Sequence, residues 1–165
     1  MDPTFDAIQE RRPRTLVLHP AISMRAELGW ALGARDMASL SAADGASGLA
    51  LLLEELLTLD ALVLNLELPG RDARAFADLV RRAGGEQELA IVVLASDPGP
   101  SLRAELAALG VDQVVDPRLG PDAVADAVVE AVSRRRSGAA AGSHPARSPR
   151  RFRGAEGLDA ISTAA

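Results

Sequence analysis

Three polar side chains that follow apolar stretches, His19, Asn65 and Glu67, are the first candidates for chemistry. A histidine in such a place can ligate a metal or titrate at roughly pH 6–7. One imidazole beside an amide and a carboxylate makes a poor ligand set, so we interpret His19 as a solvated or hydrogen-bonded side chain. Glu67 alone could hold a divalent ion weakly, but we favour a solvated loop carboxylate. Asn65 is an amide, which is a far poorer nucleophile than a carboxylate.

The sequence contains none of the common catalytic motifs. It has no glycine-rich phosphate loop, no Ser-His-Asp arrangement and no pair of catalytic carboxylates. The two histidines, His19 and His144, lie far apart, and there is no cysteine to serve as a nucleophile or zinc ligand. We therefore expect a protein that is not an enzyme and that binds neither a cofactor nor a metal.

The composition is that of one soluble domain with an uneven charge. The chain has 165 residues, of which 48% are hydrophobic, enough for one packed core. Residues 1–133 hold 11 arginines against 21 acids, whereas residues 134–165 hold 7 arginines against 2 acids. No apolar run approaches the ~20 residues that cross a bilayer, and no secretion signal is recognisable. Together with the lack of cysteine, this predicts a cytoplasmic location and no transmembrane segment.

The hydrophobic pattern predicts strands that alternate with helices. Apolar runs predict strands at residues 15–18, 61–64, 90–94 and 111–115, with a weaker candidate at 37–42. Amphipathic segments predict helices at residues 23–35, 47–57, 73–83, 101–109 and 122–134. Ser23 and Ser47 are N-cap or first-turn signals. The alternation predicts an α/β fold: a flavodoxin-like, doubly wound, five-stranded parallel sheet of order 2-1-3-4-5 with helices on both faces.

This pattern stops after Arg136. Residues 137–165 are rich in Gly, Ser, Pro and Arg and have no apolar period, so we expect a disordered tail. Residues 1–13 are expected to form a flexible N-terminus. The predicted folded domain therefore spans residues 14–136.

Several motifs of the folded part occur in the order known from one protein family. Residues 60–70 read Asp-Ala-Leu-Val-Leu-Asn-Leu-Glu-Leu-Pro-Gly, an apolar strand that runs into a Pro-Gly turn. Residues 43–49 read Ala-Asp-Gly-Ala-Ser-Gly-Leu before the second predicted helix, and residues 109–112 read Leu-Gly-Val-Asp before the last strand. Arg25 and Pro117 also match in spacing. Over residues 14–133 the chain resembles the CheY-like receiver domains of two-component response regulators, which implies a receiver fold and a role in signalling.

The positions that carry a receiver's chemistry differ, however. The resemblance implies a phosphoaccepting aspartate at Asn65, an acidic metal-binding pair at His19-Pro20 and a lysine at Asp116. It also implies a backbone carbonyl at Glu67 that binds the metal, and a threonine or serine at Ala95 that bonds the phosphoryl oxygens. The whole degenerate pocket that it implies consists of His19, Pro20, Asn65, Glu67, Ala95, Ser96 and Asp116. Phosphoryl transfer needs the metal and the cation to neutralise its transition state, and Asp116 is expected to repel phosphate. We therefore expect a pseudo-receiver that is not phosphorylated, with Asn65 as a hydrogen-bonding amide that stiffens its loop.

The resemblance also implies a protein-interaction face on the fourth helix, fifth strand and fifth helix, for a signalling partner or a homodimer. Val124, Val128 and Val132, spaced by four, would anchor the last helix to the sheet. The candidate contact residues of this face are Arg103, Glu105, Asp126 and Glu130.

Two alternatives remain open. The first is a nucleic-acid or membrane binder that acts through its tail, in which Phe152 lies among Arg147, Arg150, Arg151 and Arg153. The second is a ligand-sensing α/β domain that uses the altered pocket. Trp30, the only tryptophan, is expected in the core, although an exposed tryptophan would be a candidate binding hot spot.

Overall fold

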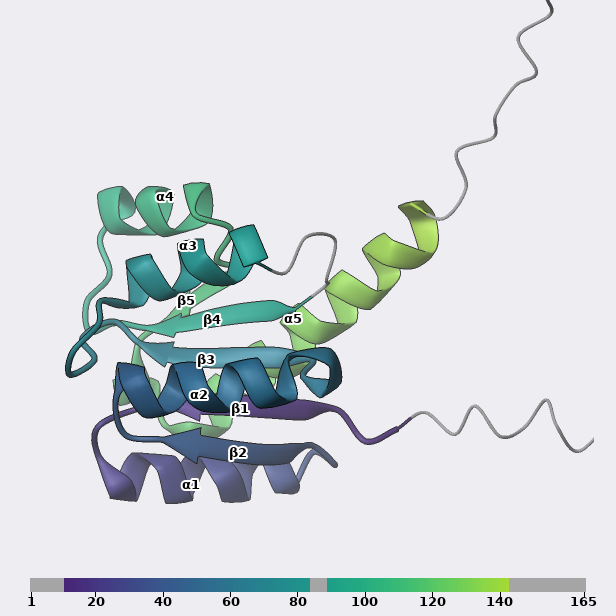
Figure 1. Ribbon diagram of the computed structural model, residues 1–165, viewed down its shortest axis with the longest axis horizontal. Coiled ribbons are helices and arrows are strands. Elements are labelled where there is room, and N and C mark those ends of the chain that lie inside the picture. Colours follow the sequence, from purple (N-terminus) through teal and green to yellow (C-terminus); the bar gives the residue numbers. More distant parts are fainter. Residues whose placement is uncertain (1–10, 84–88, 143–165) are drawn as a thin grey trace, which may run out of the picture.

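Five parallel strands form a single sheet that helices cover on both faces (Figure 1). The computed structural model describes residues 11–83 and 89–142. Their strands are β1 (Arg14–Leu18), β2 (Ala38–Ala42), β3 (Ala61–Asn65), β4 (Ala90–Leu94) and β5 (Gln113–Val115). The spatial order is β2-β1-β3-β4-β5, and every neighbouring pair is parallel. The predicted flavodoxin-like α/β fold is therefore confirmed.

Helices follow the strands in the alternation that the sequence predicts. In the described residues they are α1 (Ile22–Gly33), α2 (Gly45–Glu55), α3 (Ala73–Ala83), α4 (Pro100–Ala108) and α5 (Pro121–Gly142). Two short 3-10 turns, η1 (Leu56–Thr58) and η2 (Pro117–Leu119), complete the connections. Helices α2, α3 and α4 cover one face of the sheet, and α1 and α5 cover the other.

Each face of the sheet supports its own hydrophobic core. Strand β4 is buried along its whole length, because helices lie on both of its sides. Leu62 and Phe76 lie in the core beneath α2, α3 and α4. On the other face, Val124, Val128 and Val132 are at most 6% exposed. The prediction that their spacing anchors the last helix is therefore confirmed.

The first two helices begin one and two residues before their predicted starts, so that Ser23 and Ser47 are first-turn residues and not N-caps. Helix α1 begins at Ile22 after Ala21, which gives no side-chain cap. Helix α2 is capped by Asp44, whose carboxylate accepts a hydrogen bond from the Ser47 backbone N–H at 2.7 Å. Ser47 thus lies inside the first turn, because an ionised carboxylate is the stronger acceptor for amides at a helix N-terminus.

The fifth strand begins at Gln113, two positions after its predicted start. The chain leaves α4 through Gly110, whose φ of +87° is in the left-handed region. The backbone N–H of Val111 then bonds back to the Leu106 carbonyl at 3.0 Å. The Val111 backbone N–H therefore bonds to the C-terminal end of α4, and Val111 does not pair with β4.

Helix α5 runs to Gly142, past its predicted end at Arg134 and across the predicted domain boundary at 136. Its late turns are tied to the body, since Arg135 pairs with Asp112 at 2.8 Å and Arg136 with Asp60 at 3.3 Å. The remainder of the predicted tail, residues 143–165, lies outside the described residues.

The expected flexible N-terminus, residues 1–13, is described only in its last three residues. Residues 1–10 of the expected flexible N-terminus lie outside the described residues. Arg11 and Arg12, however, form ion pairs with Asp60 and Asp36 at 3.4 and 3.2 Å. Within residues 11–83 and 89–142, no helix is long and apolar enough to cross a membrane.

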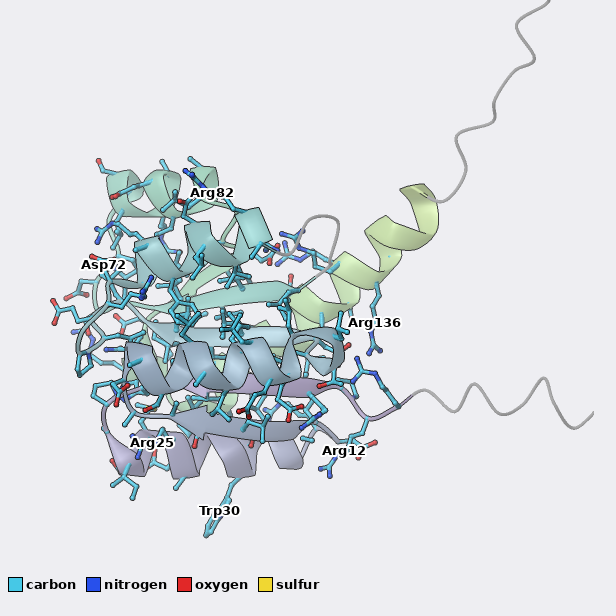
Figure 2. The ribbon with its side chains drawn as sticks, viewed as in Figure 1. Arg12, Arg25, Trp30, Asp72, Arg82 and Arg136 are labelled. Carbon is cyan, nitrogen blue, oxygen red and sulfur yellow. The ribbon has the colours of Figure 1, made fainter. Side chains whose placement is uncertain are left out.

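Trp30 lies at the surface, so its predicted place in the core is wrong. Its side chain is 84% exposed and points away from the body of the molecule (Figure 2). Leu28, Ala31 and Leu32 are the residues of α1 that are buried against the sheet. Trp30 lies on the opposite side of this helix and is largely uncovered by the described residues.

Candidate functional site

The carboxyl ends of the strands bring the predicted pocket residues to one edge of the sheet. Strand β1 leads to His19, whose backbone N–H bonds to the Ala42 carbonyl at 3.1 Å. Strand β3 ends at Asn65, which pairs in register with Leu94 of β4. The N–H of Ala95 bonds to the Val115 carbonyl at 3.1 Å. The residues that the sequence singled out therefore share one edge, as parallel strands require.

Asn65 is held by its own loop. Its side-chain amide donates a hydrogen bond to the Glu67 backbone carbonyl at 2.7 Å. This carbonyl is the group that the receiver resemblance assigns to the metal. The Asn65 amide N–H thus competes for an oxygen that the resemblance assigns to a divalent cation, and it brings no negative charge that would attract such an ion. Asn65 therefore forms a hydrogen bond within its loop, as the interpretation of Asn65 as a loop-stiffening amide requires.

His19 is engaged by its surrounding turn. Its Nδ1 accepts a hydrogen bond from the Ala21 backbone N–H at 3.0 Å, which leaves the ring proton on Nε2. The Arg25 guanidinium donates to the carbonyls of His19 and Pro20 at 2.7 and 3.0 Å. Burial and the nearby Arg25 charge lower the pKa of His19. The imidazole is therefore neutral at pH 7, and one of its two nitrogens is not free for a metal.

Asp116 lies at the end of β5, where the resemblance places a lysine, and it is neutralised locally. The Arg118 guanidinium bonds to the Asp116 carboxylate at 2.6 Å and also pairs with Asp97. The Asp97 backbone N–H donates to Asp116 at 3.0 Å. These bonds, the Arg118 ones first, hold the pKa of Asp116 well below its usual range. The expected repulsion of phosphate is thus reduced by a cation that sequence reasoning missed.

Arg118 could have been found from its spacing. Asp116 caps η2 by accepting the Arg118 backbone N–H at 2.9 Å, a local Asx-type bond that an Asp-Pro-x sequence favours. The side chain of residue 118 is then directed back toward the carboxylate. Asp97, the third member, has a positive φ of 45°, which no local sequence signal reveals.

The remaining pocket positions offer little chemistry. Ala95 is 4% exposed and has no hydroxyl with which to hold a phosphoryl oxygen. Ser96 and Glu67 are exposed. In the described part of the chain, no three His, Asp or Glu side chains are grouped closely enough to hold a metal ion.

A second feature lies on the predicted interaction face, where α4, β5 and α5 meet. An open hollow of about 290 Å³ is lined there by Arg103, Ala107, Val111, Asp112, Gln113, Val114 and Arg134. The Arg103 guanidinium donates to the Val114 carbonyl at 3.1 Å and to the Pro98 carbonyl at 3.2 Å. The lining therefore combines two cations, one acid and one amide with three apolar residues.

Of the four predicted contact residues, only Arg103 lines this hollow. Glu105 pairs with Arg74 of α3 at 2.6 Å, and Asp126 pairs with Arg35, beyond the end of α1, at 2.7 Å. These two acids therefore lie toward the flanks of the face. Glu130 pairs with Arg134 at 3.5 Å, one turn along α5.

Solved receiver domains share this architecture. The chain matches a response regulator receiver domain protein from Clostridium thermocellum with a TM-score of 0.68 and 13% identity, covering 76% of this chain and 98% of that one. A CheY-like receiver domain protein from Methanospirillum hungatei gives 0.68 and 12%, with 76% and 98% covered. The signal receiver domain of an HD domain-containing protein from Pseudomonas fluorescens gives 0.67 and 19%, with 77% and 99% covered.

The similarity to these solved domains is in the path of the backbone and not in the sequence. No family model matches the sequence, and no curated protein matches it. At identities this low, the matches show the fold alone. The chain thus has the receiver-domain fold over almost the whole length of the solved domains, and its function must be argued from its own residues.

Proposed function

We propose that this protein is a phosphorylation-independent pseudo-receiver, a cytoplasmic, non-enzymatic protein-interaction module of bacterial two-component-type signalling. The observation that carries the proposal is the hydrogen bond from the Asn65 amide to the Glu67 carbonyl. An amide stands where the resemblance places the nucleophile, and its N–H bonds to the carbonyl that the resemblance assigns to the metal. The receiver fold supports the signalling part of the proposal.

The rest of the pocket supports the same conclusion. An in-line phosphoryl transfer needs a nucleophilic carboxylate, a divalent cation and a positive charge near the transferred group. Asn65 is no such nucleophile, and His19 is a neutral, hydrogen-bonded imidazole where acids would hold the metal. The nearby Arg118 is already shared by two carboxylates.

The hollow between α4, β5 and α5 is the proposed docking surface. Arg103 and Arg134 provide positive charge, and Ala107, Val111 and Val114 provide apolar area. Asp112 adds little negative charge, because Arg135 and Arg81 already pair with it. The surface therefore fits a signalling protein that presents an acidic side chain beside apolar ones.

Incubation with acetyl phosphate and Mg²⁺ tests the loss of phosphorylation. We expect the intact mass of the full chain to stay unchanged, and Asn65→Asp alone to remain unmodified, because the acidic pair and the lysine are also missing. A catalytically intact receiver treated in parallel is the positive control. A mass increase of one phosphoryl group on the native chain that hydroxylamine reverses would refute the proposal.

Affinity capture from a bacterial lysate tests the docking surface. A protein captured by the full chain should also bind a 1–142 truncation, which retains α5 entire, in the presence of nuclease. Arg103→Glu should then weaken binding about tenfold or more, since it reverses a charge in the hollow. Arg82→Glu is the matched control, because Arg82 lies on α3, is 78% exposed and pairs only with Asp78 among the described residues (Figure 2). Equal losses for the two variants would remove the hollow as the docking surface.

A further inference from the structure

Helix α2 presents an uncharged apolar stripe to solvent. Ala46, Ala50 and Leu53 lie on one side of this helix, because residues three and four apart are neighbours on a helix surface. Leu57, in η1, continues the same spacing. Leu53 is 68% and Leu57 82% exposed, and both alanines are exposed too. We call these four residues the α2 stripe.

The outer side of α2 is unusual for a solvated helix, which normally carries polar residues away from the core. Gly48 and Leu52 are buried on its inner side, and Figure 1 shows α2 across the front of the sheet with no labelled element in front of it. Helix α3 has the usual arrangement, since Asp78 and Arg82 form an ion pair on its surface at 3.0 Å. Large apolar side chains left in solvent mark interaction sites, so we expect a partner to cover the α2 stripe.

The stripe is complementary in size to a second copy of itself. If two α2 helices pair antiparallel about a two-fold axis at the middle of the stripe, Leu53 of one copy lies opposite Ala50 of the other. Leu57 then lies opposite Ala46. Each leucine therefore meets an alanine, as the close packing of two helices requires. A two-fold contact uses the same patch on both copies, so one stripe is enough to build it.

The exposed apolar residues of α1 do not complement each other in this way. Ile22 and Trp30 lie four residues before and after Ala26. The same two-fold operation would place Trp30 opposite Ile22, one large side chain against another. The α2 stripe is therefore the better surface for a second copy.

The charges at the two ends of α2 favour the antiparallel direction. Arg71 lies at the start of α2, since a Cβ on Gly45 would be 2.6 Å from the Arg71 Cβ. Glu54 is exposed near the end of the helix. Neither Arg71 nor Glu54 forms an ion pair with the residues that the structure describes. Asp44, the other charge at the start, already accepts the Ser47 backbone N–H. Antiparallel pairing brings the start of each helix to the end of the other, where opposite charges and helix dipoles attract.

The size of the stripe predicts a weak dimer. From Ala46 to Leu57 it extends over about 16 Å, which is less than a stable interface needs and suits a transient one. We expect a dissociation constant on the order of 10–100 μM. Residues 1–133 carry 21 acids against 11 arginines, but physiological salt screens charges more than about 8 Å apart, so this net charge does not prevent the contact.

We infer that two copies of this chain pair antiparallel through their α2 stripes, with Leu53 against Ala50 and Leu57 against Ala46. Helix α2 packs on β1 and β2, whereas the hollow of the proposed docking surface lies beside β5, at the other edge of the sheet. The dimer therefore leaves the hollow of each copy open. The inference goes beyond the proposed function and does not depend on it.

Sedimentation equilibrium of the full chain at physiological salt tests the dimer. Over about 1 μM to 0.5 mM we expect a monomer–dimer equilibrium, and Leu53→Glu should weaken it at least about tenfold, because it buries an unpaired charge in each half of the contact. Trp30→Glu is the matched control, since Trp30 is 84% exposed and lies on α1, against the other face of the sheet. It should leave the dissociation constant unchanged. Because both side chains are exposed, both variants should keep the far-UV circular dichroism of the native chain.

A cysteine crosslink tests the direction of pairing, since the chain has no cysteine of its own. In the antiparallel dimer the two copies of residue 50 are offset by about 4.5 Å along the helices, whereas those of residue 46 are offset by about 16 Å. A short bis-maleimide should therefore crosslink Ala50→Cys at least about fivefold faster than Ala46→Cys.

Three results would overturn the inference. The first is a chain that stays monomeric up to about 0.5 mM. The second is a dimer that Trp30→Glu or Arg103→Glu disrupts and Leu53→Glu does not, because the contact would then lie on α1 or at the hollow. The third is equal crosslinking of Ala46→Cys and Ala50→Cys, which a parallel pair would give.

Discussion

At the amino-terminal end of the sheet, single carboxylates join several elements, whereas at the carboxyl-terminal end the polar groups bond mainly within their own loops. Asp112, just before β5, accepts the Ile91 backbone N–H at 2.8 Å. It also pairs with Arg81 from α3 at 3.2 Å and with Arg135 from α5 at 2.8 Å. Asp60, just before β3, likewise ties the start of β1 to α5. Charge at this end holds the fold together.

At the carboxyl-terminal end of the sheet, the polar side chains form most of their hydrogen bonds with residues close by in the sequence. Asn65 bonds to Glu67, two residues away, and Asp116 bonds to Arg118 at the same separation and to Asp97 in the neighbouring loop. Such contacts shape loops without joining the layers of the fold. The comparison teaches that the receiver chemistry could be lost at one end while the architecture was kept by the other.

Removal of Asp112 should have the largest effect on stability. Its side chain is 18% exposed, and those of Arg81 and Arg135 are 21% and 32% exposed. Asp112→Ala leaves the Arg135 guanidinium and the Ile91 amide without their acceptor. Arg81 loses its carboxylate but keeps its bonds to the Gly110 and Leu89 carbonyls, so we expect a loss of about 2–3 kcal/mol in the free energy of unfolding. Urea denaturation measures it. Asp97→Asn at the other end, where Asp97 is 83% exposed, should change stability by less than about 0.5 kcal/mol. Similar losses for the two variants would contradict the comparison.

The smallest effect should come from Asp116, at the carboxyl end. Its folded-state pKa lies below the ordinary value of 3.8 because Arg118 and two backbone amides stabilise the charged form. Its contribution is therefore fully present above that ordinary value and is lost as the pH falls through the lower folded-state pKa. Asp116→Asn should lower Tm at pH 6 by only about 1–2 °C, and the difference should shrink toward pH 2. A difference that grows in acid would show that the pairing is not the cause.

Local sequence determined most of the architecture. The apolar runs of β3 and β4 and the helical periods between the strands sufficed for a parallel sheet covered on both faces, because each element's burial pattern is determined by its own residues. The loss of the phosphoacceptor was equally visible, since the chemistry of an amide at residue 65 does not depend on its surroundings. The hydrogen bond that Asn65 makes needed only a partner two residues away.

Only the tertiary structure decided where Trp30, Arg118 and the end of α5 lie. Helix α1 has apolar residues on all sides, so its period could not show which side meets the sheet, and Trp30 was assigned to the wrong one. Arg118 gains Asp97 as a partner across two loops that no local signal relates. The last turns of α5 lack an apolar period of their own, and Arg135 and Arg136 extend the helix by pairing with carboxylates far away in the sequence. A pattern within one segment fixes the type of element it forms, whereas pairing between distant segments depends on their arrangement in space.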